Sequence, residues 1–251
     1  MNAIELDNVS KVFSIPHERR RTLFHWISSL GKGKYDFEPL FALKDVSLQV
    51  REGEFVGLIG RNGCGKSTLL KIISRIYSPT KGGIRVKGNI FPLLELGVGF
   101  QPEFSCKENV FLYGSTLGFT RKQLSSRLKS ILEFAEIERF VDAKLATLST
   151  GMIVRLAFAI AVQSEAEIYL VDEGLAVGDS AFKEKCRLEF SRMKQQGRTL
   201  LFVSHDMSEI QQFCDRALVM ENGQVVNTGQ PDEMVVYYLE RRHPNERPTT
   251  A

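Results

Sequence analysis

The sequence predicts an α/β fold with a mainly parallel sheet, and three observations support this prediction. Residues 54–60, 168–173, 199–205 and 216–220 are short apolar segments with the composition of buried strands. Helical segments separate these strands along the chain. The first strand runs directly into a glycine-rich loop that opens a helix. Because neighbouring parallel strands need a crossover connection, alternating strands and helices indicate a parallel sheet.

The remaining segments add two expected subdomains. Residues 4–13 and 42–50 alternate apolar and polar side chains, and we expect an antiparallel β subdomain. Residues 65–76 predict a helix, and residues 81–91 predict one strand after a turn. Residues 108–137 predict helices that interrupt the alternation. We therefore expect an inserted helical subdomain over about 102–150, within one domain spanning 1–240, and a tail or linker over 241–251.

Composition narrows the class of protein. The chain has 251 residues, of which 43% are hydrophobic and 25% charged, which is ample for a packed core. A net charge of only +3 does not indicate a nucleic-acid binder. The four cysteines form no CxxC pair, which argues against zinc and disulfides and favours a reducing compartment. We see no signal peptide, and the apolar run at 156–162 is much shorter than the ~20 residues of a membrane span.

Residues 60–68, GRNGCGKST, match the phosphate-binding pattern GxxxxGK[ST] in full. A chance glycine-rich turn is disfavoured because the motif follows a strand and precedes a helix, the context that it requires. Its glycines let backbone N–H groups close around phosphates, Lys66 can reach the β and γ oxygens, and Ser67 can ligate Mg²⁺. The predicted cofactor-binding residues of this loop are Gly60, Asn62, Gly63, Cys64, Gly65, Lys66, Ser67 and Thr68.

Two acids end the apolar segment 168–173. Ligands of open α/β sheets bind beyond the carboxyl ends of the strands. We therefore predict that Asp172 faces Mg²⁺, through water, and that Glu173 polarises the attacking water. An ordinary exposed turn is the alternative, and the phosphate-binding loop makes it the weaker one.

Three further polar residues are candidates. His205 ends another strand on the same predicted edge and could hydrogen-bond the γ-phosphate; the alternative is an ordinary surface histidine. Gln101 could position water or metal, or be a simple loop residue. Ser149 precedes an apolar helix, where its side chain could cap the first turn or help to form a second anion site.

These motifs together resemble the nucleotide-binding subunit of ABC transporters over about residues 3–240. The resemblance rests on five ordered segments: 60–68, LSTGM at 148–152, 168–173, AVGD at 176–179, and Ser-His at 204–205. It implies that two cassettes pair head to tail, so that Ser149 and Gly151 of one chain face the γ-phosphate held by the other. LSTGM departs from the usual LSGGQ at Thr150 and Met152.

The resemblance also assigns roles to two other residues. Asp179 would lie at the dimer seam and couple the two sites, and Phe13 would stack on adenine. The alternative for Phe13 is a core strand residue. The implied cofactors are ATP and Mg²⁺, and the implied partners are a second nucleotide-binding subunit and an integral membrane permease, with no nucleic acid.

A narrower resemblance concerns the exporters of lipid-linked polysaccharides, which serve O-antigen, capsule and teichoic acid systems. It rests on LLELGVGF (93–100), the PEFSCKENV that follows closely, and DEGLAVGD (172–179). It implies a peripheral ATPase at the cytoplasmic face of the inner (plasma) membrane, with lipid-linked polysaccharide as an indirect partner. The alternatives are a subunit of another ABC importer or exporter, and a soluble ABC ATPase, which the single phosphate-binding loop disfavours.

Residues 17–34 predict a basic amphipathic helix. Its apolar positions Leu23, Trp26, Ile27 and Leu30 recur at helical spacing between basic flanks. This helix could pack on its own domain. Alternatively, it could lie under the membrane at the channel mouth, where Arg19, Arg20 and Arg21 would help to admit the lipid-linked head group.

Overall fold

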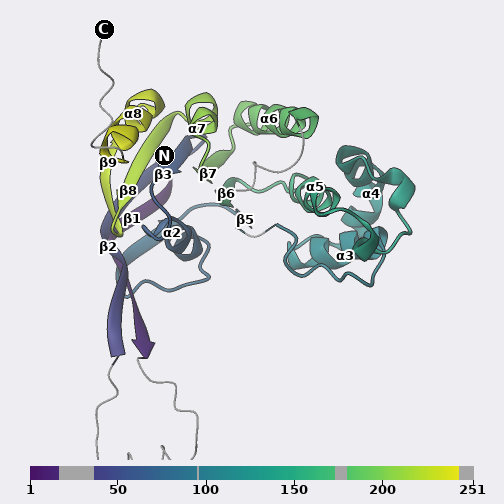
Figure 1. Ribbon diagram of the computed structural model, residues 1–251, viewed down its shortest axis with the longest axis horizontal. Coiled ribbons are helices and arrows are strands. Elements are labelled where there is room, and N and C mark those ends of the chain that lie inside the picture. The colour runs from purple at the N-terminus through teal and green to yellow at the C-terminus, as the bar shows by residue number, and fades with distance from the viewer. Residues whose placement is uncertain (17–36, 95, 173–179, 243–251) are drawn as a thin grey trace, which may run out of the picture.

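The computed structural model describes residues 1–16, 37–94, 96–172 and 180–242, and Figure 1 shows their arrangement. The predicted helix at 17–34, together with Glu173 and Asp179, lies outside these ranges. The elements follow in the order β1 (Asn2–Pro16), β2 (Phe37–Arg51), β3 (Phe55–Ile59), α2 (Lys66–Ile73), β4 (Lys81–Val86), β5 (Ile90–Leu93), α3 (Cys106–Thr116), α4 (Arg121–Ala135), η1 (Glu138–Phe140), η2 (Leu145–Thr147), α5 (Thr150–Ala161), β6 (Ile168–Asp172), α6 (Ser180–Gln195), β7 (Thr199–Val203), α7 (Met207–Phe213), β8 (Arg216–Glu221), β9 (Gln224–Gly229) and α8 (Pro231–Arg242).

The strands form two sheets. The main sheet has the order β5-β6-β7-β3-β8-β9. The strands β5, β6, β7, β3 and β8 are parallel to one another, and β9 pairs antiparallel with β8. The smaller sheet has the order β2-β1-β4 and is antiparallel throughout. The α/β fold, the mainly parallel sheet and the antiparallel β subdomain are therefore confirmed.

Helices cover both faces of the main sheet, and alternating strand residues supply the two buried surfaces. On β3, Val56 and Leu58 join α2 and the smaller sheet in one core, whereas Phe55 and Ile59 pack with α6, α7 and α8 in the other. Figure 1 shows α2 on the side of the main sheet opposite to α6, α7 and α8. Burial on both faces explains why these strands are continuously apolar.

The helical block, which we define as α3, α4, η1 and η2, lies at the end of the molecule away from β1 and β2 (Figure 1). Both long helices begin at capping boxes, in which the side chains of Ser105 and Thr120 accept hydrogen bonds from the third helical residue. Helix α5 packs against this block and also against the main core through Phe158. The inserted helical subdomain is thus present in the fold.

One strand prediction is wrong. Residues 81–91 do not form a single strand: β4 pairs with β1 in the smaller sheet, and β5 pairs with β6 in the main sheet. The chain turns between them at Gly88, whose φ is 111°. The Glu167 carboxylate accepts a hydrogen bond from the Asn89 N–H at 3.0 Å, and a Cβ atom on Gly88 would lie 2.0 Å from that carboxylate. Only glycine permits this crossing between sheets.

Candidate nucleotide-binding site

The loop between β3 and α2 is held by backbone contacts that leave no room for side chains at two glycines. A Cβ atom on Gly60 would lie 2.5 Å from the carbonyl oxygen of Met220. One on Gly65, whose φ is 110°, would lie 2.6 Å from the carbonyl oxygen of Ala42. The N–H of Gly223 donates to the Cys64 carbonyl at 2.9 Å. The neighbouring strands β2, β8 and β9 therefore fix the shape of this loop.

Lys66 lies inside this loop. The residue is only 5% exposed, and its ammonium donates to the carbonyl oxygens of Gly60 at 2.7 Å and Arg61 at 3.1 Å. A buried cation surrounded by loop backbone is a suitable partner for an anion that enters the loop. Gly65 caps α2 without any side-chain hydrogen bond, so the first turn of the helix faces the same position.

The other predicted loop residues surround this position. Asn62 and Ser67 are exposed, and Thr68 is half-buried at the start of α2. Asn62, Gly63 and Cys64 line a cavity of about 530 Å³ that extends to Tyr238 and Arg241 of α8. Burial raises the pKa of the Cys64 thiol, which keeps this residue neutral inside the loop.

Strand order brings Asp172 and His205 to the same edge as the loop. Asp172 ends β6 and is paired with Val203 of β7. His205 follows Val203 by two residues. Strand β7 is in turn paired with β3, which leads into Gly60. Three neighbouring parallel strands therefore deliver an ammonium, a carboxylate and an imidazole at their carboxyl ends. Asp172 is half-buried and His205 is exposed.

A buried pair supports the loop that carries His205. The Ser204 hydroxyl donates to the Glu209 carboxylate at 2.6 Å and accepts from the Asp206 N–H at 3.0 Å. Both Ser204 and Glu209 are buried, and burial raises the pKa of Glu209. The contact of Ser204 with Glu209 was not predicted, because burial of a glutamate within a polar loop has no signature in the sequence.

Phe13 is half-buried and belongs to none of the hydrophobic cores among the described residues. Its ring meets the edge of Tyr77 at a centroid distance of 5.5 Å. The Lys11 ammonium lies 5.1 Å from the Phe13 centroid and 5.5 Å from that of Tyr77. This arrangement disfavours the alternative of a core strand residue. Tyr77 and Lys11 were not predicted, since they are brought together only by the approach of β1 to the end of α2.

Gln101 is exposed at the entrance to the helical block. Its N–H donates to Asn109 Oδ1 at 2.7 Å, and its carbonyl accepts from Asn109 Nδ2 at 2.9 Å. The side chain of Asn109 also bonds to the carbonyls of Phe104 and Ser105. A fully buried asparagine thus fixes the backbone of this loop and leaves the glutamine side chain at the surface. The role of Gln101 in binding metal or water stays a prediction.

Ser149 is the N-cap of α5, and its hydroxyl accepts a hydrogen bond from the Met152 N–H at 3.3 Å. The capping alternative is therefore real, and it does not exclude an anion, because Ser149 remains exposed. Gly151 is half-buried beside it. Figure 1 shows α5 beside the helical block and separated from α2. Within one chain, the helix that Ser149 caps therefore lies apart from the helix that begins at Lys66.

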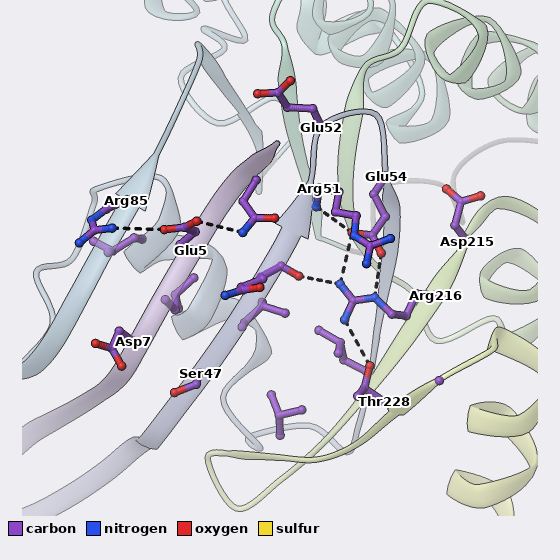
Figure 2. A pocket seen from close by; sticks show the side chains of 18 of the residues that line it. Glu5, Asp7, Ser47, Arg51, Glu52, Glu54, Arg85, Asp215, Arg216 and Thr228 are labelled. Atoms are coloured by element: carbon purple, nitrogen blue, oxygen red, sulfur yellow. Dashed lines mark hydrogen bonds and ion pairs between the residues drawn. The ribbon is translucent and has the colours of Figure 1, made fainter.

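A larger cavity, of about 1340 Å³, lies at the opposite edge of the main sheet. Figure 2 shows its ion pairs, in which Arg216 at the start of β8 contacts Glu54 at 2.7 Å and Arg85 contacts Glu5 at 3.5 Å. Two other carboxylates of its lining, Glu52 and Asp215, pair with Lys87 and Lys194 outside the lining. The larger cavity is therefore separate from the candidate site, which is defined by the carboxyl ends of the strands.

The comparisons with known proteins agree with this geometry. A family model described as ABC transporter matches residues 43–176. The O-antigen export system ATP-binding protein RfbB of Klebsiella pneumoniae is 41% identical over 241 residues, which cover 94% of this chain and 96% of that protein. The chain belongs to the ABC transporter family. The ABC transporter protein AbcA of Aeromonas salmonicida is 38% identical over 240 residues, 96% of this chain and 77% of that protein.

A solved structure confirms the fold class of this ABC protein. The ATP-binding cassette MJ0796, in a dimeric post-hydrolysis state bound to ADP and Pi, superposes with a TM-score of 0.72 and is 26% identical; the match covers 91% of this chain and 98% of that one. The prediction of an ABC-type ATPase is thus confirmed at the level of family and fold. In the described part of the chain, no helix is long and apolar enough to cross a bilayer.

Proposed function

We propose that this chain binds and hydrolyses ATP to power the export of a lipid-linked polysaccharide. The observation that carries the ATPase is the buried Lys66 ammonium at the edge where β3, β6 and β7 end. The cargo is supported by the O-antigen export relative, which this chain matches over nearly its whole length.

The residues at the site suit a nucleoside triphosphate with Mg²⁺. The backbone of residues 60–68 and the Lys66 ammonium would hold the β- and γ-phosphates. Ser67 and Asp172 would hold Mg²⁺, with Gln101, because all three offer the oxygen ligands that this ion prefers. These residues would thereby place the positive charge of Mg²⁺ beside the phosphates, where it would neutralise charge that develops during hydrolysis. Phe13, with Tyr77 packed against its edge, would receive the adenine.

Hydrolysis would require little more than positioning and electrostatic stabilisation. Glu173 follows Asp172 directly and would polarise the attacking water. His205 would hydrogen-bond the γ-phosphate from the end of the neighbouring strand. The buried pair of Ser204 and Glu209 would hold the His205 loop in place.

The complete site would be shared by two copies of this chain. Helix α5, which begins beside Ser149, lies apart from α2, which follows the phosphate-binding loop of the same chain (Figure 1). Placed against a second chain, the start of α5 would present the Ser149 hydroxyl and backbone N–H groups to the γ-phosphate. Asp179 would lie at the seam between chains. The dimeric state of the similar cassette supports this arrangement.

The remaining partner would be an integral membrane permease. The chain would sit against it at the cytoplasmic face of the inner membrane, and the polymer would be an indirect partner. ATP-driven closing of two cassettes, followed by opening after hydrolysis, would supply the force for transport.

The decisive test is Glu173→Gln. This variant should keep ATP affinity, because residues 60–68 are unchanged, and lose most turnover, because water activation is removed. ATP should then hold a stable homodimer, seen as a doubled mass by size exclusion with light scattering. Hydrolysis at the wild-type rate would exclude Glu173 as the catalytic base.

The cargo needs a separate test in cells that depend on this chain. Glu173→Gln, at normal protein levels, should remove polysaccharide from the cell surface while lipid-linked polymer accumulates inside. Normal surface polysaccharide together with lost ATPase activity would exclude the proposed cargo and leave the ATPase standing.

A further inference from the structure

Three helices meet at one carboxylate outside the nucleotide site. Glu136 follows α4, and its Oε2 atom contacts Arg155 Nη1 of α5 at 3.0 Å. Its Oε1 atom is paired with the Lys185 ammonium of α6. The carboxylate therefore bridges the helical block, the helix that begins at Ser149, and a helix of the main domain. Figure 1 shows α5 between α4 and α6.

The backbone at Glu136 is unfavourable for a glutamate. Glu136 is the C-cap of α4 with φ 60° and ψ 41°, the left-handed conformation. Glycine is the usual residue at such a position, because a side chain there costs about 1–2 kcal/mol. A glutamate that occupies a position suited to glycine, and pairs with the side chains of Arg155 and Lys185, indicates that its carboxylate has a structural or functional role.

An aromatic cluster lies beneath the ion pairs. The Arg155 guanidinium lies 5.0 Å from the ring centroid of Phe182, which is the buried residue one turn before Lys185. Phe182 meets Phe134 of α4 at 5.8 Å and Phe158 of α5 at 6.0 Å. The same three helices thus share apolar contacts below Glu136, and the carboxylate fixes their polar rim. The Arg155 side chain is 15% exposed and that of Glu136 is 46% exposed, so the carboxylate lies at the solvent-facing edge of this contact.

We propose that Glu136 is a positioning residue that sets the orientation of α5, and thereby of Ser149, relative to the main domain. Arg155 lies six residues after Ser149, which is ~9 Å along the helix. A change of angle at Arg155 moves the start of α5, where the second chain's γ-phosphate is to be met. This inference rests on the shared site of the proposed function. Nucleotide binding by the isolated chain should not depend on Glu136, because Cys64 of the phosphate-binding loop packs with α2 in one core, whereas Phe182 beneath Glu136 belongs to the core on the other face of the main sheet.

The test compares Glu136→Gly with Glu133→Gln. Glu136→Gly removes the carboxylate and gives the backbone the residue that it favours, so the variant should fold. Glu133→Gln removes the same charge three residues earlier, where the carboxylate pairs with Lys129 within α4 at 3.6 Å. A second comparison changes Lys185, which pairs with Glu136. Lys185→Met removes the positive charge of this side chain, and Lys185→Arg keeps it.

We expect fluorescent-nucleotide affinity to change less than about twofold in all four variants. In the Glu173→Gln background, ATP-driven dimerisation should weaken about fivefold or more in Glu136→Gly and Lys185→Met, and stay normal in the two controls. With Glu173 intact, ATPase kcat should fall in Glu136→Gly and Lys185→Met while the KM of ATP stays similar. Normal dimerisation in Glu136→Gly would overturn the inference, and so would a loss of nucleotide affinity. A parent chain that fails to dimerise with ATP would instead refute the shared site.

Discussion

The chain has two helix N-termini with a predicted phosphate role, and they are built differently. At α2, Gly65 has a left-handed backbone and the loop is fixed by surrounding strands, with Lys66 buried inside. At α5, Ser149 has an extended backbone, caps its helix with its side chain and remains exposed. The first position is specified by backbone geometry within the core. The second depends on side chains at the surface, which is where a second chain can reach it.

The largest effect should come from adding a methyl group where the backbone leaves no room. Gly65→Ala places a Cβ atom 2.6 Å from the Ala42 carbonyl oxygen. Strain and overpacking together should lower the free energy of unfolding by about 2–4 kcal/mol and abolish nucleotide binding. Urea unfolding and nucleotide titration measure the two effects.

Gly63→Ala is the matched control for this comparison. Gly63 also has a positive φ, 79°, but a Cβ atom there would meet nothing within 4 Å. Only the backbone strain remains, about 1–2 kcal/mol. Equal destabilisation by both substitutions would show that the close approach to Ala42 is not what fixes the loop.

Lys66→Ala should act on binding and leave most of the stability intact. It removes charge-assisted hydrogen bonds to phosphate worth about 1.5–3 kcal/mol each, so ATP affinity should fall about tenfold or more. Lys71→Ala, near the other end of the same helix, removes the same charge away from the loop and should change affinity little. Similar losses in both variants would mean that Lys66 contributes only net charge.

Substitutions of Ser149 should separate capping from the shared site. Ser149→Ala loses the bond to the Met152 N–H and should cost about 1 kcal/mol of stability. Ser149→Arg loses the same cap and also adds bulk where a second chain would dock. Both variants should keep the ATP affinity of the isolated chain. In the Glu173→Gln background, Ser149→Ala loses only the hydroxyl and should weaken ATP-driven dimerisation, whereas Ser149→Arg should abolish it. Dimerisation by Ser149→Arg would refute the two-chain site.

The same contrast explains what could be predicted from the sequence. Residues 60–68 form a contiguous motif whose geometry is local, and the strand ends at Asp172 and His205 follow from the parallel topology. Residues that act through distant partners had no comparable signal. Tyr77 reaches Phe13 only because β1 approaches the end of α2, and Asn109 acts through the backbone of Gln101. The prediction of a single strand over 81–91 was wrong for a related reason, because the chain turns at Gly88 from one sheet into the other.

The smallest expected effect concerns two carboxylates in the loop that carries His205 and the way in which they make the stability of the fold depend on pH. Burial raises the pKa of Glu209, while a hydrogen bond from the Ser208 hydroxyl lowers the pKa of Asp206, only three residues away. The folded chain therefore holds the proton of Glu209 more tightly than the unfolded chain does. Its contribution to stability is fully present below the unfolded pKa and is lost as pH rises through the folded pKa. Asp206 has the opposite sign, and its contribution is lost as pH falls.

Glu209→Gln should therefore remove one of two opposing slopes. Glutamine keeps an acceptor for the Ser204 hydroxyl, so the fold should survive. We compare the unfolding free energy of the variant with that of the wild type at about pH 8 and at about pH 4.5. The difference should favour the variant more at pH 8, by less than ~1 kcal/mol, which is the usual cost of a lost helix cap. Asp206→Asn should act with the opposite sign and at lower pH, because the unfolded pKa of an aspartate is about 3.9 and the folded pKa lies below it. This variant should lose less stability than the wild type between about pH 4.5 and about pH 3. Urea unfolding at the three pH values measures both effects. Parallel slopes in the two variants would contradict the opposite pKa shifts, and would mean that the loop carrying His205 is held by its backbone, as the phosphate-binding loop is.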